Sequence, residues 1–326
     1  MRNFTFKGLF LEVVFIVLGS LSIQAADGDL ITKQITIKLE EAGTLPSKIG
    51  DTKKYKITNL KIMGEINGTD LCFIREMAGS DREGWRTEGK LATLDLSGAK
   101  IVRGGGIYYN SVNCYTSDDV IGNYAFSGCS GLISLTLPSN VTSIGYSAFY
   151  GCIRLTSLTL PSSVTSIGSS AFEGCSSLTS LILPSSVTEI GSSAFYGCSG
   201  LTSLTLPSSV TSIGWATFSG CSGLTSIYVS WESPLSIDAS TFKDANTGKC
   251  ILYVPKGTYD DYWLSNWGIF ENIVEYDATG IDHITTSGEA KEISRYAADG
   301  QRLEVPAKGL NIVKYSDGSV KKVVVQ

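Results

Sequence analysis

The chain has 326 residues, of which 43% are hydrophobic and 17% charged, so it is long enough to bury a core and has the composition of a folded protein. Its formal net charge of -5 and its pI of about 5.1 provide no long-range attraction for nucleic acid or an anionic membrane. Nucleic-acid binding is therefore excluded from the expected functions.

The first 25 residues have the layout of a secretory signal peptide. Arg2 and Lys7 precede an apolar run from Leu9 to Ile23, and the small residues Ala25 and Ala26 follow it. No second charged flank closes the run, which disfavours a membrane anchor. The sequence predicts export to the cell surface or the extracellular space, in association with an outer membrane, with no transmembrane span in the mature chain.

Residues 26–56 are predicted to form an N-terminal cap. Gln34 to Leu39 alternates as a strand does, and Glu40 to Ile49 is expected to form a short turn of helix that Pro46 breaks.

Residues 57–120 are interpreted as divergent repeats with an insertion. Asp70 to Ala78 predicts a helix that begins at Thr69 or Asp70. The insertion between Ser97 and Asp119 is expected to be a loop in which Gly104 to Gly106 allow a flexible turn. The Leu-x-x-Leu-x-Leu spacing occurs twice here, at Ile57, Leu60 and Ile62, and at Leu91, Leu94 and Leu96.

Residues 121–275 contain the regular array and its C-terminal cap. A period of 23 residues containing Leu-x-x-Leu-x-Leu predicts a leucine-rich repeat solenoid. We expect a parallel β ladder with a convex side of short 3-10 helices and loops. The copies begin at Ile121, Ile144, Ile167, Ile190 and Ile213.

The recurring positions define the expected core. In the copy that starts at Ile190, Ser203 and Thr205 alternate with Leu204 and Leu206, which places the leucines inward and the hydroxyls outward. One phenylalanine per coil predicts a stacked aromatic column. Its members are Phe126, Phe149, Phe172, Phe195 and Phe218.

Cysteines also recur, once in each coil. Structural zinc needs ligands two to four residues apart, so a 23-residue spacing excludes it. Stacked side chains point in parallel, which favours an unpaired buried column over disulfides. A bond between Cys72 and Cys114 stays open in an exported protein. The column consists of Cys129, Cys152, Cys175, Cys198 and Cys221.

Catalysis is disfavoured by the same array. Its four complete repeats hold three charged residues, Arg154, Glu173 and Glu189, and no histidine. The single histidine of the chain, His283, lies beyond the repeats. We therefore expect neither an enzyme nor a cofactor or metal site.

The function that remains after these exclusions is the binding of a partner by an extended surface. Serine and threonine form a hydroxyl ladder on the strand face, and large aromatic residues occupy positions that vary from coil to coil. Such rings either anchor a partner or cover the edges of the coils. The candidate partner-binding residues are Tyr124, Tyr146, Tyr150, Tyr196, Trp215 and Tyr228.

The repeat pattern becomes irregular after Ile237 and Phe242. Thr258 with Asp261 resembles a helix cap, and Trp263, Trp267, Phe270 and Ile273 supply apolar bulk to close the solenoid. Residues 276–281 are interpreted as a linker. Residues 282–326 predict a small β module with hairpin turns at Asp299-Gly300 and Asp317-Gly318.

The repeat from Ile167 or Ile190, Ile-Gly-Ser-Ser-Ala-Phe-x-Gly-Cys-Ser-x-Leu-Thr-Ser-Leu-x-Leu-Pro-Ser-Ser-Val-Thr, resembles that of BspA-type leucine-rich repeat surface proteins. The resemblance covers roughly residues 30 to 275. The tail, with Asp299-Gly300-Gln301 and Lys321-Lys322-Val323, is similar to sorting domains of the type IX secretion route.

The resemblance implies adhesion to a protein ligand, including host matrix proteins such as fibronectin and fibrinogen. Two alternatives remain at this point: a glycan-binding module, in which the exposed rings stack on sugars, and a purely structural surface stalk.

Overall fold

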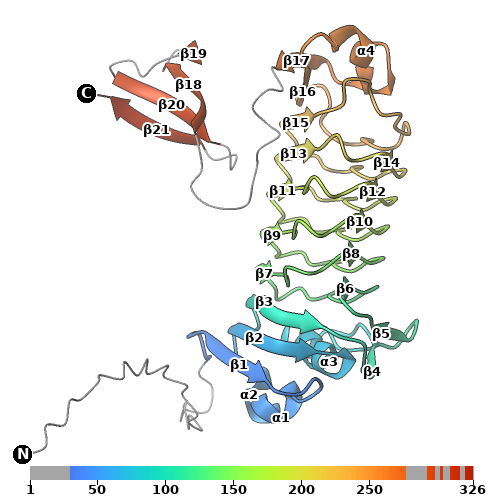
Figure 1. Ribbon diagram of the computed structural model, residues 1–326, viewed down its shortest axis with the longest axis vertical. Helices are drawn as coiled ribbons and strands as arrows, with labels where there is room; N and C mark the ends of the chain where they lie inside the picture. The colour runs from blue at the N-terminus through green and yellow to red at the C-terminus, as the bar shows by residue number, and fades with distance from the viewer. Residues whose placement is uncertain (1–29, 277–291, 298–301, 304–308, 316–319, 326) are drawn as a thin grey trace, which may run out of the picture.

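The computed structural model describes residues 30–276 and the strands at 292–297, 302–303, 309–315 and 320–325. The predicted signal peptide, most of the predicted linker and both Asp-Gly turns of the tail lie outside the described residues. Residues 30–276 form a stack of coils along one axis (Figure 1), which confirms the leucine-rich repeat solenoid.

The main ladder is parallel throughout and consists of two five-stranded sheets. Leucines pair with leucines across coils, as Leu135 does with Leu158, because the 23-residue period brings the same side chain to the same place. The first sheet holds β1 (Ile35–Leu39), β2 (Asn59–Ile66), β3 (Thr93–Ile101), β7 (Ser134–Thr136) and β9 (Ser157–Thr159). The second holds β11 (Ser180–Ile182), β13 (Ser203–Leu206), β15 (Ser226–Val229), β16 (Ile251–Pro255) and β17 (Asn272–Tyr276).

A second parallel ladder lies on the opposite side of each coil (Figure 1). Short strands and turns take the place of the expected 3-10 helices there, because the backbone bonds to the coil before, as Gly168 N does to Ile144 O at 2.8 Å. Single turns follow each strand, closed by bonds such as Cys152 N to Phe149 O. The strands are β6 (Val120–Ile121), β8 (Ser143–Ile144), β10 (Ser166–Ile167), β12 (Glu189–Ile190) and β14 (Ser212–Ile213).

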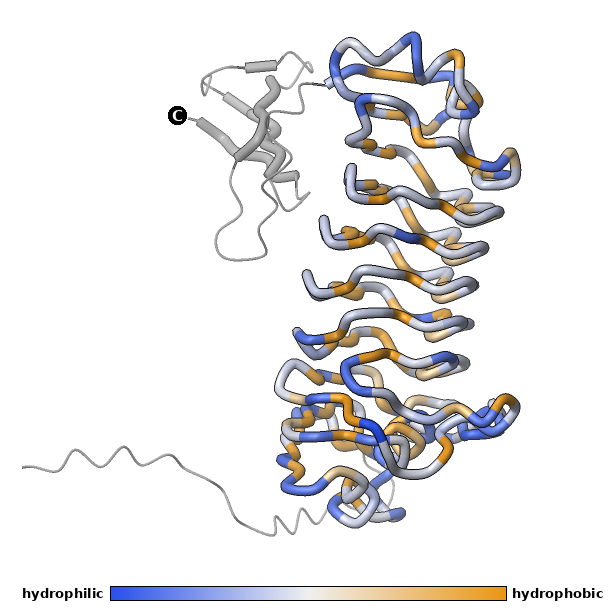
Figure 2. The backbone as a smooth tube through the Cα atoms, turned by 45° about the vertical axis from the view of Figure 1, so that its right-hand side comes forward, coloured by the Kyte–Doolittle hydropathy of each residue, from blue (hydrophilic) through white to orange (hydrophobic). Residues whose placement is uncertain are grey.

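The core between the two ladders repeats coil by coil (Figure 2). The predicted phenylalanine column is confirmed: adjacent rings are nearly parallel, with centroids 5.0 to 5.5 Å apart. Phe242 extends the column by one further ring, 5.3 Å from Phe218. Leu204 and Leu206 are buried as predicted, which leaves Ser203 and Thr205 on the outer side.

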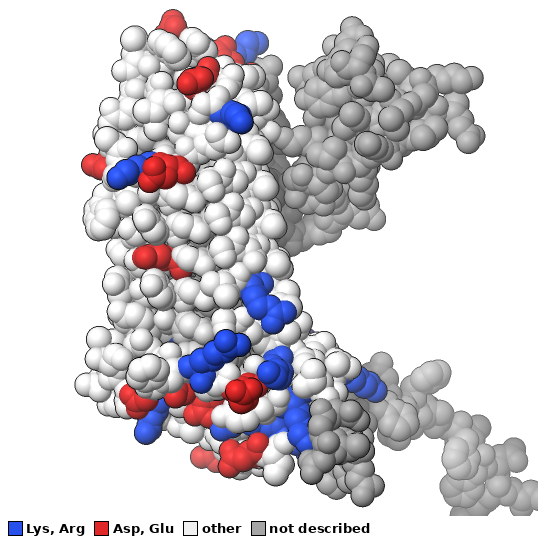
Figure 3. Space-filling view, turned by 180° about the vertical axis from the view of Figure 1, so that it is seen from behind, with Lys and Arg blue, Asp and Glu red and all other residues white. Residues whose placement is uncertain are grey.

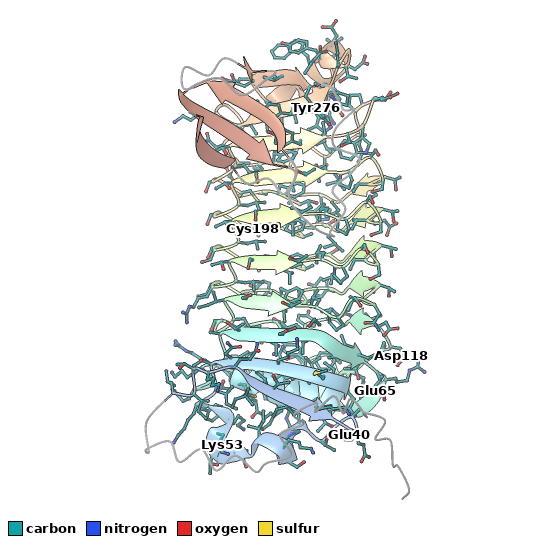
Figure 4. The ribbon with its side chains drawn as sticks, turned by 60° about the vertical axis from the view of Figure 1, so that its left-hand side comes forward. Glu40, Lys53, Glu65, Asp118, Cys198 and Tyr276 are labelled. Atoms are coloured by element: carbon teal, nitrogen blue, oxygen red, sulfur yellow. The ribbon has the colours of Figure 1, made fainter. Side chains whose placement is uncertain are left out.

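The cysteine column is buried and its thiols are free, as predicted; Figure 4 labels Cys198 in the middle of the stack. Each thiol from the second coil on donates to a phenylalanine carbonyl one coil back, for example Cys175 Sγ to Phe149 O at 3.2 Å. Burial raises the pKa of Cys129 to about 11 and that of Cys221 to about 12. Cys72 and Cys114 are also free.

The N-terminal helices differ from expectation at their ends. Pro46 lies in the first turn of α1 (Leu45–Ile49) and so starts the helix instead of breaking it, because its missing N–H needs no partner there. α2 (Asp51–Lys54) follows directly. α3 (Gly68–Met77) begins earlier than predicted: Asn67 is its cap, and Asp70 completes a capping box.

The insertion is a packed hairpin, β4 (Gly104–Tyr109) and β5 (Cys114–Thr116), and the predicted flexible turn is wrong. Gly106 N donates to Thr69 Oγ1 at 3.0 Å, which fastens the hairpin to α3. Gly68 allows this approach, since a Cβ there would lie 2.1 Å from Gly106 O.

The C-terminal cap is formed by α4 (Tyr259–Trp263) and the 3-10 helix η1 (Asn266–Ile269). Trp267 and Phe270 are buried as predicted, but Tyr262 takes the inward place expected for Trp263, which is exposed. Thr258 precedes α4 without capping it, because its Oγ1 donates to Pro255 O at 2.7 Å.

The tail contains β18 (Glu292–Ala297), β19 (Arg302–Leu303), β20 (Gly309–Tyr315) and β21 (Val320–Val325). They form an antiparallel sheet in the order β19-β18-β20-β21, which confirms the small β module. Tyr276, assigned to the linker from the sequence, is the last residue of β17. Within the described part of the chain, no helix has the length and apolar character needed to cross a membrane.

Candidate partner-binding surface

Four of the six candidate residues lie on one edge of the solenoid, in the turns that follow the short strands. We call Tyr146, Tyr150, Tyr196 and Trp215 the aromatic row. Their side chains are 45%, 47%, 45% and 62% exposed. Each of the four side chains thus exposes close to half of its surface or more to solvent.

The row occupies two turn positions. Tyr150 and Tyr196 each follow a core phenylalanine, two coils apart, with Glu173 at the same position between them. Tyr146 and Trp215 each follow the glycine after a core isoleucine, three coils apart, with serines between them. Small or polar residues at these positions in the other coils show that the core does not require a ring there.

Backbone hydrogen bonds fix the row to the coils. Gly128 N donates to Tyr150 O at 2.7 Å, and Gly174 N donates to Tyr196 O at 2.8 Å. Gly151 N donates to Glu173 O at 2.8 Å in the same way. The backbone of Tyr150, Glu173 and Tyr196 is thus hydrogen-bonded to the preceding coil. These bonds hold the backbone beneath the rings in place.

Tyr124 supports the row and is not one of its exposed rings. It is half-buried, stacked on Tyr109 at 4.7 Å and edge-on to Tyr146 at 5.3 Å. Burial, followed by the neighbouring Tyr146, raises the pKa of Tyr124 to about 12. Its φ of 59° is the left-handed conformation that Ser147 adopts in the next coil. Tyr124 therefore packs against the ring of Tyr146 and supports it.

Tyr228 lies apart from the row, on the main ladder. It is half-buried in β15 and stacks on Tyr253 of β16, with ring centroids 4.3 Å apart. The six candidates thus divide between two faces, and the exposed ones among them lie at the turn edge.

A threonine in each coil has a structural role that sequence reasoning missed. Thr156 Oγ1 donates to Ile133 O at 3.1 Å, and the threonines of later coils repeat this bond to the coil before. A second set, from Thr142 to Thr211, does the same beside the short strands. Their strict recurrence was the available signal. These hydroxyls stitch coils together, whereas Ser157 and Thr159 face outward.

Arg75 is a second feature that the sequence did not reveal. It is fully buried in α3 and donates to Tyr124 O at 2.6 Å, to Ala125 O, to Ser80 Oγ and to Asp81 O. Its guanidinium also lies 5.0 Å from the centre of the Tyr109 ring. Arg75 therefore joins α3, the hairpin and the first regular coil beneath Tyr146.

The coils around the row carry little charge. Figure 3 shows one face on which Lys, Arg, Asp and Glu gather over the N-terminal part while the regular coils are almost free of them. Among the described residues, no group of His, Cys, Asp and Glu could hold a metal ion. What this edge offers is aromatic surface and hydroxyl groups, which suits binding and provides no acid or base pair.

The fold and this edge define a leucine-rich repeat solenoid with an exposed aromatic turn surface. Residues 119–248 match the BspA type leucine rich repeat region in six copies. The match coincides with the regular coils.

Several solved structures are similar to the chain. The leucine rich repeat protein of T. pallidum is 29% identical over 48% of this chain and 62% of its own, with a TM-score of 0.34. A leucine rich cell surface protein of Faecalibacterium prausnitzii is 24% identical over 68% and 51%, with a TM-score of 0.37. The pneumococcal vaccine antigen PcpA is 20% identical over 67% and 57%, with a TM-score of 0.43.

This chain spans between about half and two thirds of the length of these three proteins. No curated protein matches it.

Proposed function

We propose that the chain is a non-catalytic, exported surface protein that binds a protein partner through the aromatic row. The observation that carries this proposal is the placement of four large exposed rings on one edge of rigid coils, at positions where the core requires none. Tyr and Trp are the side chains that most often anchor protein interfaces.

The rigidity of the edge supports the proposal energetically. Binding through mobile side chains loses free energy to ordering, at roughly 0.5–1.5 kcal/mol per side chain. Tyr and Trp have only two side-chain torsions, and the coil-to-coil bonds already hold the backbone beneath them. The row therefore presents contact area whose ordering cost is small.

We propose matrix proteins such as fibronectin and fibrinogen as the partners. The test is binding of the purified protein to each immobilised protein, with and without Tyr146→Ala and Tyr150→Ala together. Loss of two anchors should weaken binding by at least about tenfold, since an anchor contributes on the order of 1–2 kcal/mol or more.

The matched control is Tyr259→Ala with Trp263→Ala, which removes two exposed rings from the C-terminal cap. Circular dichroism of both variants should equal that of the parent. Parent-like binding by the Tyr146 and Tyr150 variant would refute the aromatic anchor. Binding to a glycan array in place of the matrix proteins would favour the glycan module, and binding to neither would favour a stalk.

We further propose that residues 1–25 direct export and that residues 282–326 are a sorting domain of the type IX kind. The sequence pattern of both segments supports this. Deleting 282–326 should leave the solenoid folded but keep it from the cell surface. Unchanged surface exposure, measured by protease shaving of intact cells, would refute the sorting role.

A further inference from the structure

The spacing of the rings in the aromatic row carries information about the partner's shape. Tyr150 and Tyr196 directly follow Phe149 and Phe195, whose rings stack through Phe172 at 5.0 and 5.1 Å per coil. Strands in a ladder are ~4.8 Å apart, so equivalent residues two coils apart lie roughly 10 Å from one another. The two tyrosines therefore mark a repeat of about this length along the solenoid axis.

A polyproline II helix has a closely similar repeat. It has three residues per turn and a rise of ~3.1 Å per residue, so equivalent side chains recur every ~9.3 Å. We propose, on the basis of the partner-binding function above, that the partner segment is a proline-rich polyproline II helix lying along the solenoid axis. Prolines one turn apart stack on Tyr150 and Tyr196.

The chemistry of the edge fits this occupant. A polyproline II helix makes no internal hydrogen bonds, so its carbonyl oxygens remain open to donors. The phenol groups of the row can donate to them, as aromatic grooves do in known proline-rich recognition. In the two coils between Tyr146 and Trp215, the position of these rings is occupied by the small residues Ser169 and Ser192. The segment can therefore pass beside Tyr150 and Tyr196 without meeting a large side chain there.

Glu173 adds one charged contact between the two rings. It lies between Tyr150 and Tyr196, is half-exposed, and is one of three charged residues in the complete repeats. A basic residue of the segment between its two stacked prolines can pair with this carboxylate. The complete repeats contain two further charged residues, Arg154 and Glu189.

Other backbone shapes fit the edge less well. An added β-strand would need free main-chain groups, but the amide groups of Gly151 and Gly174 already bond across coils. Side chains on one face of a strand also recur every ~6.7 Å, which does not match the two tyrosines. An α-helix bonds its backbone carbonyls internally, so it offers the phenol groups of the row no main-chain acceptors.

The test uses the full chain and a synthetic peptide with proline at every third position and one arginine between two of them. A peptide of the same composition in scrambled order is the control. Isothermal titration calorimetry should detect binding of the periodic peptide and at least about tenfold weaker binding of the scrambled one. Tyr150→Ala and Tyr196→Ala should each weaken binding, and Tyr259→Ala with Trp263→Ala should leave it unchanged.

A swap variant separates spacing from composition. Glu173→Tyr with Tyr196→Glu keeps the same residues but places the two rings on adjacent coils. The periodic peptide should bind this variant at least about tenfold more weakly, while circular dichroism stays the same. Equal binding of the periodic and scrambled peptides, or parent-like binding by the swap variant, would overturn the proposal.

Failure of this inference is distinguishable from failure of the proposed function. If matrix proteins bind through Tyr146 and Tyr150 but the periodic peptide does not bind, the polyproline segment is wrong and the protein partner stands. If the row binds glycans and neither kind of protein ligand, both proposals are wrong.

Discussion

Phe172 shows at the scale of one residue why the coils stack. Its ring is fully buried and lies about halfway along the column, 5.0 Å from Phe149 and 5.1 Å from Phe195. Phe172→Ala should lower the free energy of unfolding by about 3–5 kcal/mol, because it leaves a cavity in a packed column. Phe172→Asp should be worse, since it buries an unpaired charge. Urea denaturation measures both.

The control for Phe172 is Tyr150→Ala, which removes an exposed ring from the neighbouring coil. It should change stability by no more than about 0.5 kcal/mol. A Phe172→Ala protein as stable as this control would show that the column does not hold the coils together.

The cysteine column predicts a loss of stability at alkaline pH. Burial raises the pKa of Cys129 to about 11 and of Cys221 to about 12, and raises the pKa of Cys152, Cys175 and Cys198 well above the ordinary thiol value of 9.0. The unfolded chain therefore loses these protons first. The stabilisation is complete below about pH 9 and is lost as pH rises through the folded pKa values, at about 1.4 kcal/mol per pH unit for each thiol.

Urea denaturation should thus give free energies of unfolding that change little between about pH 8 and 9 and fall between about pH 9 and 10. Cys198→Ala removes one of these thiols, so the free energy of unfolding should fall less steeply with pH than in the parent, by about 1.4 kcal/mol per pH unit at most. A stability that stays constant over this range would contradict the burial of protonated thiols.

The single residues that the sequence predicted best are those that recur. Phenylalanine and cysteine repeat in every coil, and a strict period allows only one interior explanation for them. Arg75 occurs once, in α3, so no pattern marked it as buried. Tyr124 and Tyr228 were grouped with the exposed rings because the sequence does not show which neighbours, Tyr109 and Tyr253, cover them.

The joint between α3, the β4–β5 hairpin and the first regular coil is the element whose stability depends on one side chain. Arg75 makes four hydrogen bonds there without a carboxylate partner among the described residues. Arg75→Lys keeps the charge but cannot reach four acceptors from one ammonium group. It should lower the free energy of unfolding by about 2 kcal/mol or more, because buried acceptors lose their donor.

Arg82→Lys is the matched control, since the Arg82 side chain is 59% exposed and its change should be nearly neutral. Hydrogen exchange of the hairpin amides should rise in the Arg75 variant and not in the Arg82 variant. Equal protection of the hairpin in the two variants would show that Arg75 does not hold this joint.

Among the elements, the main ladder followed from the sequence and the second ladder did not. Strands such as Ser143–Ile144 have two residues, too few to show an alternating pattern. The hairpin was missed for a different reason. Its three glycines suggested flexibility, whereas close packing of Gly68 on Gly106 O is a property of the tertiary fold. The Thr258 cap failed because the hydroxyl donates backward to Pro255 O.

At the scale of the whole molecule, a solenoid whose regular coils carry little charge presents one edge of exposed rings. The coils differ from one another mainly at that edge, where Tyr146, Tyr150, Tyr196 and Trp215 replace small or polar residues. The sequence identified these rings, but the structure was needed to show that they share an edge and that Tyr228 does not. A partner that uses the row should therefore contact several consecutive coils.

Hydroxyl-radical footprinting of the chain with a bound matrix protein tests this account most directly, because it measures the oxidation of every exposed ring at once. We expect protection of Tyr146, Tyr150, Tyr196 and Trp215, with unchanged oxidation of Tyr115 on the hairpin and Trp263 on the cap. Unchanged oxidation of the aromatic row, with protection confined to the main ladder, the hairpin or the cap, would contradict it.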